Sequence, residues 1–454
     1  MSFSDSVSVS SKTDTSSLIF IAGIALYGNK KTKPYIIERE IPFKQGDYVL
    51  RKDLKEKLLT AKHQIINTGL FLETIVSVEN QFGDLVFISV SVKEKWYLYP
   101  LPYFKLADRN FNEWWVTHKA SLSRVNYGIK FQYNNVSGRN DRTILWLISG
   151  YSRQIAFKYE RPYIDKALKN GFNIYFNYSK QKEINFKTDS NTSKQVFIKL
   201  PADFIKQTTR VSADYVYRPA IKTRHIFRFA YMNERVDDSV LKANPAYFPQ
   251  QNTHLSFPEI SYILQYNNTD YYAYPTKGFQ YEASLMQRGF TKDFNLTQLQ
   301  FTGSYTLPVA PKSQFQFQLG TMLKLPFSQP YYNKQLFGYG NIFLQGLEYY
   351  VIDGVAGAAG RFTARTQAVS FVLKSPSKVQ KQIALPVRIF AKAYTNAGYA
   401  YNEEPGITFL NNRWLITGGF GADVVITYDI VFKFDYSFNQ FGESGLFIHV
   451  RRDF

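Results

Sequence analysis

The sequence predicts a mainly β protein, in which a sixteen-stranded antiparallel transmembrane β-barrel follows one small α/β domain. Three observations favour this fold class. Aromatic residues make up 17% of the 454 residues although only 45% are hydrophobic, and from Tyr97 onward apolar and polar residues alternate. No stretch approaches the roughly 18 consecutive apolar residues of a transmembrane helix. A barrel wall accounts for all three, because its strands turn apolar side chains to lipid and polar ones to the lumen.

The first 95 residues have helical as well as strand patterns. We expect residues 1–16, which are Ser-rich and polar, to be a flexible lead, and residues 17–95 to form a β-α-α-β-β domain. The expected elements, in order, are a strand over Leu18–Leu26, a helix over Pro34–Glu40, a helix over Asp53–Thr68, and strands over Leu72–Glu79 and Leu85–Val92.

The second of these helices has both end signals. Asp53 is the expected N-cap, with Glu56 at the N3 position, and Gly69 stands where a C′ glycine belongs. Leu54, Leu58, Ala61 and Ile65 form an apolar stripe at helical spacing. This helix is therefore expected to pack one face on the sheet.

Residues 96–454 are expected to form the barrel. In one segment Phe315, Phe317 and Leu319 alternate with glutamines, and in another Phe432, Phe434 and Tyr436 alternate with Lys433 and Asp435. About sixteen such segments fill the region, and the resulting length per strand and loop fits spanning strands of about 9–11 residues with turns. The polar face carries Gln, Lys, Arg and Asp, as a water-filled lumen allows.

The chain ends on an alternating strand. Leu446, Ile448, Val450 and Phe454 lie on one expected face, and His449, Arg451 and Asp453 lie on the other. A terminal Phe that closes such a strand is similar to the targeting signal of outer-membrane proteins, although that signal favours an aromatic residue where this chain has Arg452.

Charge and motifs exclude several function classes. Of the net charge of +19, residues 1–95 carry +2 and the rest +17, scattered through aromatic strands with no nucleic-acid module, so we expect no nucleic-acid partner. There is no Cys, the five His have no metal-ligand spacing, and no nucleophile or phosphate-binding motif occurs. We therefore expect no enzyme activity, metal or cofactor. No signal peptide is visible at the start of this chain.

Several segments together resemble the BamA/TamA-type family of outer-membrane proteins. Gly28-Asn29-Lys30 is similar to the opening of a POTRA domain, and Pro275-Thr276-Lys277-Gly278 resembles the turn before a central barrel strand. Leu344-Gln345-Gly346-Leu347 lies where the family has its lid motif, Val/Ile-Arg-Gly-Phe/Tyr. Tyr394-Thr395-Asn396-Ala397-Gly398 lies where it has Phe-x-Asp-x-Gly on the barrel wall. The resemblance implies a POTRA domain over 17–95, in the periplasm, and a lid loop at about 338–364.

The departures from these motifs lead to a further expectation. In the family, the lid arginine reaches into the lumen and pairs with the wall aspartate, but Gln345 and Asn396 stand at the matching positions here. Losing both charges can leave a neutral amide–amide hydrogen bond. We expect the lid to fold inward with Gln345 and Asn396 as neighbours. The alternative is that the docking is lost. The small residues over 354–360 are expected to form a snug turn rather than a mobile plug.

The resemblance implies a non-hydrolytic outer-membrane protein that assists insertion or assembly of other outer-membrane proteins. The POTRA sheet edge would capture clients, and the seam between the first strand, around 97–105, and the last, 444–454, would template them. Two alternatives stay open: an accessory barrel subunit without insertase activity, and a dedicated protein secretion pore. Expected partners are outer-membrane lipid or lipopolysaccharide, client or partner outer-membrane proteins, and lipoproteins.

Overall fold

A computed structural model describes residues 17–107, 113–165, 167–200, 204–292, 294–340, 342–374, 384–403, 408–426 and 430–452. The chain divides after Lys95 into two compact units. Each unit has its own sheet, so the two are described separately.

Unit 1 is a four-stranded sheet with two helices. Its elements, in chain order, are β1 (Leu18–Tyr27), α1 (Pro34–Glu38), β2 (Tyr48–Leu50), α2 (Leu54–Ile66), β3 (Phe71–Phe82) and β4 (Leu85–Glu94). The strand order is β2-β1-β4-β3, and β1 runs parallel to β4. Ala61 and Ile65 of α2 are fully buried, as are Ile19, Ile88 and Val90 of the sheet. The apolar stripe of the predicted helix therefore packs in the core.

Two details of unit 1 differ from the sequence expectations. The short edge strand β2 was not predicted, because three residues are too few to show alternation. Asp53 does not cap α2: it lies in a one-turn 3₁₀ segment (Arg51–Asp53) with helical φ and ψ, and its side chain makes no capping hydrogen bond. Gly69 has the left-handed φ of 75°, two residues after the C-cap Asn67.

Unit 2 is built on one antiparallel sheet of sixteen strands, which confirms the predicted strand number. The strands are β5 (Leu98–Leu106), β6 (Val125–Asn134), β7 (Arg142–Gly150), β8 (Ser152–Arg161), β9 (Asn170–Gln181), β12 (Lys206–Ala220), β13 (Thr223–Val236), β14 (His254–Thr269), β15 (Gly278–Arg288), β16 (Leu296–Ala310), β17 (Ser313–Leu325), β20 (Ala356–Lys374), β21 (Ala384–Tyr401), β22 (Trp414–Ile426), β23 (Ile430–Asn439) and β24 (Ser444–Arg452). Each strand pairs with its neighbours in chain order, and β5 and β24 are the two end strands.

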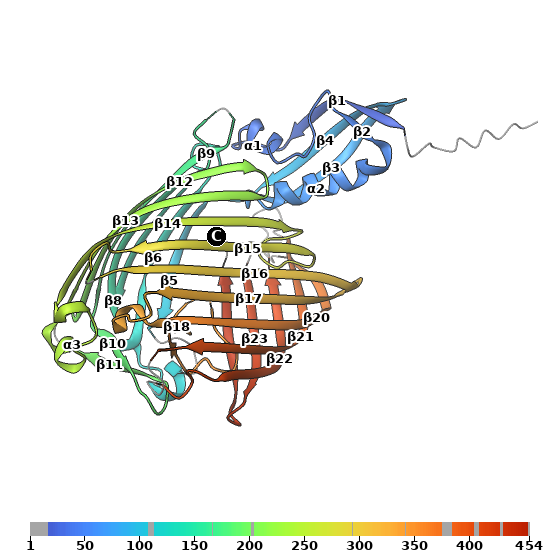
Figure 1. The fold of residues 1–454 in the computed structure, drawn as a ribbon. Helices are drawn as coiled ribbons and strands as arrows, with labels where there is room; N and C mark the ends of the chain where they lie inside the picture. Colours follow the sequence, from blue (N-terminus) through green and yellow to red (C-terminus); the bar gives the residue numbers. More distant parts are fainter. Residues whose placement is uncertain are drawn as a thin grey trace, which may run out of the picture. The chain divides into compact units, whose positions relative to one another are not determined.

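The sheet curves strongly (Figure 1) and keeps the predicted alternation. In β17, Phe315, Phe317 and Leu319 are exposed, whereas Gln314 and Gln316 are buried. Apolar side chains therefore cover the outer face, and polar side chains line the interior. None of the described helices is long and apolar enough to cross a membrane.

Strand length varies in a regular way around the sheet. β5 and β24 have nine residues each, whereas β20 has 19 and β21 has 18. The shortest strands therefore lie near both ends of the sheet. The connections between strands hold the smaller elements β10 (Glu183–Thr188), β11 (Gln195–Lys199), α3 (Asp238–Ala243), β18 (Gln335–Phe337) and β19 (Ile352–Asp353).

Candidate functional site

The segment of residues 334–355 between β17 and β20, here called the lid, packs against the inner face of the sheet. Its side chains Leu336, Phe337, Leu344 and Leu347 are at most 5% exposed. They share one apolar cluster with Ala400, Leu410 and Leu415 of the β21–β22 region. Hydrophobic burial therefore holds the lid inside the sheet, which agrees with the expected inward fold.

The lid ends earlier than its expected boundary. Residues 356–364 are not part of the loop, because they form the first half of β20 and pair with β17 and β21. A Cβ at Gly357 would lie 2.8 Å from side-chain atoms of both Leu336 and Phe337. Residues 356–360 are thus part of a strand, and form neither a turn nor a mobile plug. Because their side chains are small, the lid can pack closely against the inner face of β20.

The glycines of the lid motif and of the wall motif also allow the lid to lie close to the wall. A Cβ at Gly398 of β21 would lie 3.0 Å from Cδ2 of Leu344, and one at Gly346, where φ is +94°, would lie 3.0 Å from the carbonyl oxygen of Phe438. Either substitution would push the lid away from the wall. Tyr394 of the wall motif is buried, and its hydroxyl lies 2.7 Å from Oγ of Ser437.

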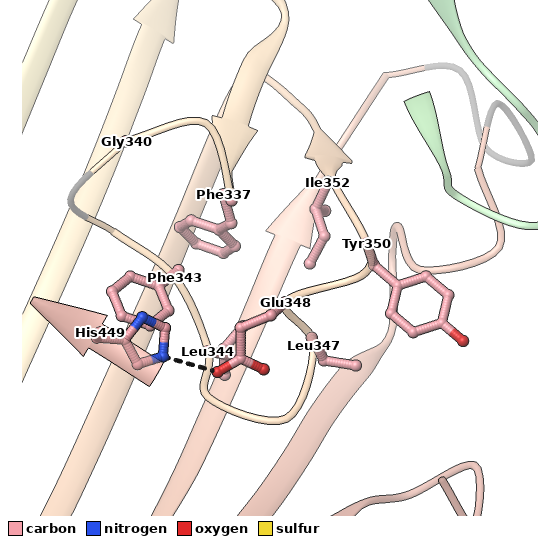
Figure 2. A pocket seen from close by; sticks show the side chains of 10 residues that line it. Phe337, Gly340, Phe343, Leu344, Leu347, Glu348, Tyr350, Ile352 and His449 are labelled. Atoms are coloured by element: carbon pink, nitrogen blue, oxygen red, sulfur yellow. Dashed lines mark hydrogen bonds and ion pairs between the residues drawn. The ribbon is translucent and has the colours of Figure 1, made fainter. Parts of the chain in front are cut away.

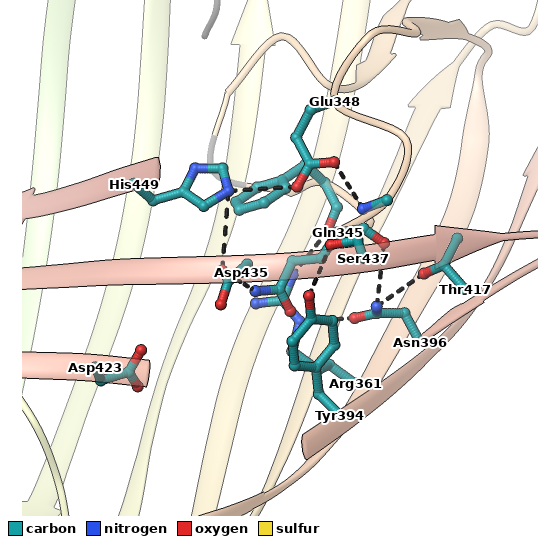
Figure 3. Close-up of polar contacts among 12 residues, drawn as sticks. Gln345, Glu348, Arg361, Tyr394, Asn396, Thr417, Asp423, Asp435, Ser437 and His449 are labelled. Carbon is teal, nitrogen blue, oxygen red and sulfur yellow. Dashed lines mark hydrogen bonds and ion pairs between the residues drawn. The ribbon is translucent and has the colours of Figure 1, made fainter. Parts of the chain in front are cut away.

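Gln345 and Asn396 are neighbours, but they do not form the expected amide–amide hydrogen bond (Figure 3). Nδ2 of Asn396 donates to the main-chain oxygen of Gln345 at 3.4 Å and to Oγ1 of Thr417 at 2.8 Å. The side chain of Gln345 instead donates to Oδ2 of Asp435 on β23 at 2.6 Å. A charge-assisted hydrogen bond to a carboxylate is stronger than one between neutral amides, so Gln345 has a better acceptor than Asn396.

A positive charge is present at this site, and the wall supplies it. Arg361 of β20 faces Asn396 across the β20–β21 ladder. Its Nε donates to Oδ1 of Asn396 at 2.7 Å, its Nη2 donates to the lid carbonyl of Phe343 at 3.2 Å, and its guanidinium lies 5.1 Å from the Phe343 ring centroid. Arg361 therefore binds both the wall and the lid.

Two carboxylates of the wall, on β22 and β23, form ion pairs near the lid. Nζ of Lys392 is 2.6 Å from Oδ1 of Asp423 and 2.5 Å from Oδ1 of Asp435, and all three side chains are at most 4% exposed. Asp435 thus joins the Lys392 pair to Gln345 of the lid. A buried charge needs such partners, since an isolated one carries a large desolvation cost.

The lid also touches the last strand of the sheet. Nε2 of His449 on β24 lies 3.3 Å from Oε1 of Glu348, and its ring centroid lies 5.3 Å from that of Phe343, with the two rings tilted by 40°. The Tyr349 and Phe447 rings are 5.4 Å apart. Figure 2 shows the lid, Glu348 and His449 around a shared pocket of about 170 Å³. These contacts connect the lid directly to an end strand.

The described part of β24 follows the expected facing. Leu446 and Ile448 are 49% and 37% exposed on the outer face, whereas Phe447 is 3% exposed and faces the interior. The side chain of Val450 and all of Phe454 lie outside the described residues. No ladder joins β24 to β5 in the described part of the chain.

The sequence reasoning missed Arg361, Glu348 and the role of Asp435. Asp435 was recognised only as one polar residue of an alternating strand. Several charged residues of β20–β23 face inward by the alternation of these strands. Because buried charges require partners, this number of charges was the available sign that ion pairs form there. Their pairing needs the register between distant strands, which a single sequence does not contain.

Comparisons with known proteins identify domains in both units. The model of the Omp85 superfamily domain matches residues 135–349, and a POTRA model, described as a surface antigen variable number repeat, matches residues 19–95. No match is found among curated protein sequences.

Two solved structures are similar in fold. One is BamA from Haemophilus ducreyi lacking POTRA domains 1–3, at 15% identity and a TM-score of 0.52, with 95% of this chain and 84% of that chain covered. The other is CdiB from Escherichia coli, at 9% identity and a TM-score of 0.51, with 98% and 92% covered.

Proposed function

Because residues 135–349 match the Omp85 superfamily domain and residues 19–95 match a POTRA model, we propose that this chain assists insertion of other proteins into the bacterial outer membrane. The POTRA domain would lie in the periplasm. The process needs no hydrolysis, since the driving force is the pairing and lipid burial of the client strands.

The observation that carries the proposal is the pair of end strands. β5 and β24 each pair on one side only in the described residues. An unpaired strand edge presents a row of free N–H and C=O groups, which a client strand can match. A seam between β5 and β24 would therefore act as a template for incoming strands.

Strand length supports the same location for client entry. Nine residues, as in β5 and β24, span about 30 Å along the strand and less across a membrane when the strand is tilted. The hydrocarbon core is about 30 Å thick. The bilayer would thin beside the short strands, and thinning lowers the cost of inserting a new strand there.

In unit 1, the outer edge of β3 is the capture site that we propose for clients. β3 has twelve residues and pairs only with β4 in the described chain. Ile75 and Phe82 on this strand are 51% and 67% exposed. An extended client segment would add as a fifth strand there, with Ile75 and Phe82 as apolar contacts for its side chains.

A photo-crosslinking residue at Leu446 tests the seam in cells. Leu446 is 49% exposed on β24, and Leu285, 44% exposed on β15 in the middle of the sheet, is the matched control. Adducts with newly made outer-membrane proteins are expected from position 446 only. Equal labelling from both positions would contradict a templating seam.

Depletion of the protein separates this function from its rivals. Loss of many outer-membrane barrels is the expected result. Loss of one exported protein would support a dedicated secretion pore instead, and loss of one complex would support an accessory subunit.

The capture step has its own variant pair. Ile75→Lys places a charge on the β3 edge, while Leu59→Lys alters an equally exposed position, 51%, on α2. Ile75→Lys alone should reduce crosslinks between unit 1 and clients, because an edge lysine discourages strand addition.

A further inference from the structure

A row of basic residues crosses the outer face of four neighbouring strands. The strand registers place Arg153 of β8 opposite Lys180 of β9, Lys180 opposite Gln207 of β12, and Gln207 opposite Arg235 of β13. Adjacent strands are about 4.8 Å apart, so the row extends over about 14 Å.

The row lies on the outer, apolar face of the sheet. Side chains two or four positions along the same strands point the same way, and these include Ile155, Phe176 and Tyr231, which are 52%, 39% and 49% exposed. The basic row is therefore the end of an apolar and aromatic surface. Basic residues that border an apolar and aromatic surface are typical of the interface between the hydrocarbon core and the lipid headgroups around a transmembrane barrel.

The positive charges of the row are close together. Arg153 and Lys180 are directly opposite one another, and like charges in that position repel. The cationic groups of Arg153, Lys180 and Lys182 lie 5.2, 5.5 and 5.9 Å from the centroid of the single Phe204 ring. Within the described residues, none of these three cations, nor Arg235, has an ion pair.

Two neighbouring carboxylates face the other way, and the exposed Asp237, two residues beyond Arg235, accepts a hydrogen bond from the main-chain N–H of Ser239. Glu234 and Glu259 are each 3% exposed on the interior face. Glu234 pairs with Lys206, and Glu259 pairs with Arg210 and Arg288. The outer face thus keeps its positive potential, and an anion from outside the chain would relieve the repulsion.

The position of the row in the sheet indicates which leaflet it would meet. The chain enters the sheet from unit 1 at the start of β5, and strand direction alternates from there. The end of β9 and the start of β12 therefore lie at the opposite end of the sheet from that entry. If the POTRA unit is periplasmic, this end is in the outer leaflet.

We propose that Arg153, Lys180, Lys182 and Arg235, with Phe204, form a site for the phosphate groups of an anionic lipid in the outer leaflet. The site rests on the proposed outer-membrane location. The guanidinium and ammonium groups bind phosphate oxygens, and the ring and the apolar face below it contact the lipid body.

The test uses the full chain in phosphatidylcholine nanodiscs doped with lipid A or with phosphatidylglycerol, and native mass spectrometry counts the retained lipid. The wild type should retain phosphate lipids over phosphatidylcholine. The variant with Arg153→Gln, Lys180→Gln and Arg235→Gln should lose affinity about 100-fold, at about fivefold for each charge. The control replaces Lys222, Lys277 and Lys312, in turns at the opposite end of the sheet, by Gln and should bind like the wild type.

Each outcome bears on the proposal. Tighter retention of lipid A than of phosphatidylglycerol identifies a glycolipid, and equal retention identifies any lipid phosphate; both support the site. Full displacement by millimolar inorganic phosphate, or unchanged binding by the triple variant, overturns it. Unfolding in zwitterionic detergent checks folding, and the variant should be at least as stable because repulsion is removed. A wild type that enters nanodiscs without preferring phosphate lipids refutes this site alone, whereas failure to enter them also refutes the proposed location.

Discussion

Arg361 is the residue whose removal should release the lid most directly. We consider Arg361→Met, which keeps an unbranched apolar stem but removes the guanidinium. The change deletes the hydrogen bonds to Oδ1 of Asn396 and to the lid carbonyl of Phe343, and the contact with the Phe343 ring. The wall is expected to stay folded, because the β20 ladder is unaffected.

The magnitude follows from these three contacts. A hydrogen bond from a charged donor contributes about 1.5–3 kcal/mol, and a cation–π contact contributes about 0.5–1 kcal/mol at a solvated site. Lumen water can replace part of what is lost, so we expect the docked lid to be destabilised by about 3 kcal/mol. This corresponds to an open population about 100 times larger.

The assay uses the absence of native cysteine. Because the chain has none, Leu347→Cys introduces a single thiol in the lid at a position that is 5% exposed. The rate of its reaction with a maleimide reports how often the lid opens. We expect the rate to rise about 100-fold when Arg361→Met is added.

Arg365→Met is the matched control. Arg365 also belongs to β20 and is buried, but it donates to the carbonyl of Pro275 and to Gln316 rather than to the lid. Arg365→Met should keep the thiol reaction rate within about threefold of the rate with Arg365 present, because it should change the free energy of lid opening by less than about 1 kcal/mol. Equal rates in the two variants would refute the assignment of Arg361 as the residue that holds the lid.

Three further predictions concern the same site. Gly398→Ala should open the lid by about 1–3 kcal/mol in the thiol assay, because the new Cβ meets Leu344, and its effect should be smaller in a Leu344→Ala background. Lys392→Met should lower the unfolding temperature of the sheet strongly, since Asp423 and Asp435 lose their cation, and Asp435→Asn should recover part of the loss. Glu348→Gln and His449→Gln should be non-additive by about 0.5–1 kcal/mol in a double-mutant cycle on the thiol rate; additivity would show that lid and last strand are uncoupled.

The strands were predictable because their signal is local. Alternation over β17 and β23 appears in the sequence as pairs of adjacent residues with opposite polarity, and the structure places Phe317 and Phe434 outside and Asp435 inside. The stripe of α2 was predictable for the same reason, since helical spacing places Ala61 and Ile65 on one face.

The contacts of the lid could not be obtained in this way. The motif positions indicated where lid and wall meet. The partner of Gln345, however, is Asp435, 90 residues away, and it is brought there by the pairing register of β20 to β23. The sequence showed that two charges were missing from their usual positions. It did not show that Arg361 on β20 and Asp435 on β23 supply charges beside the lid.

The direction of the lid contacts has a consequence for the order in which the chain matures. The wall groups that bind the Gln345 region, at Arg361, Asn396 and Asp435, all follow it in the sequence, as does His449 of the last strand. When this part of the lid leaves the ribosome, these partners have not yet been made, although Ser193, which binds Val351, has been. The contacts of the Gln345 region must therefore wait until β20 to β24 have paired.

Until that point the apolar lid side chains that pack on Ala400, Leu410 and Leu415 would be accessible. A chain truncated before β23 would lack Asp435 and His449, so its lid would miss the contacts of Gln345 and Glu348 and would open more often to periplasmic chaperones and proteases. Lid docking would thereby distinguish a finished protein from an unfinished one.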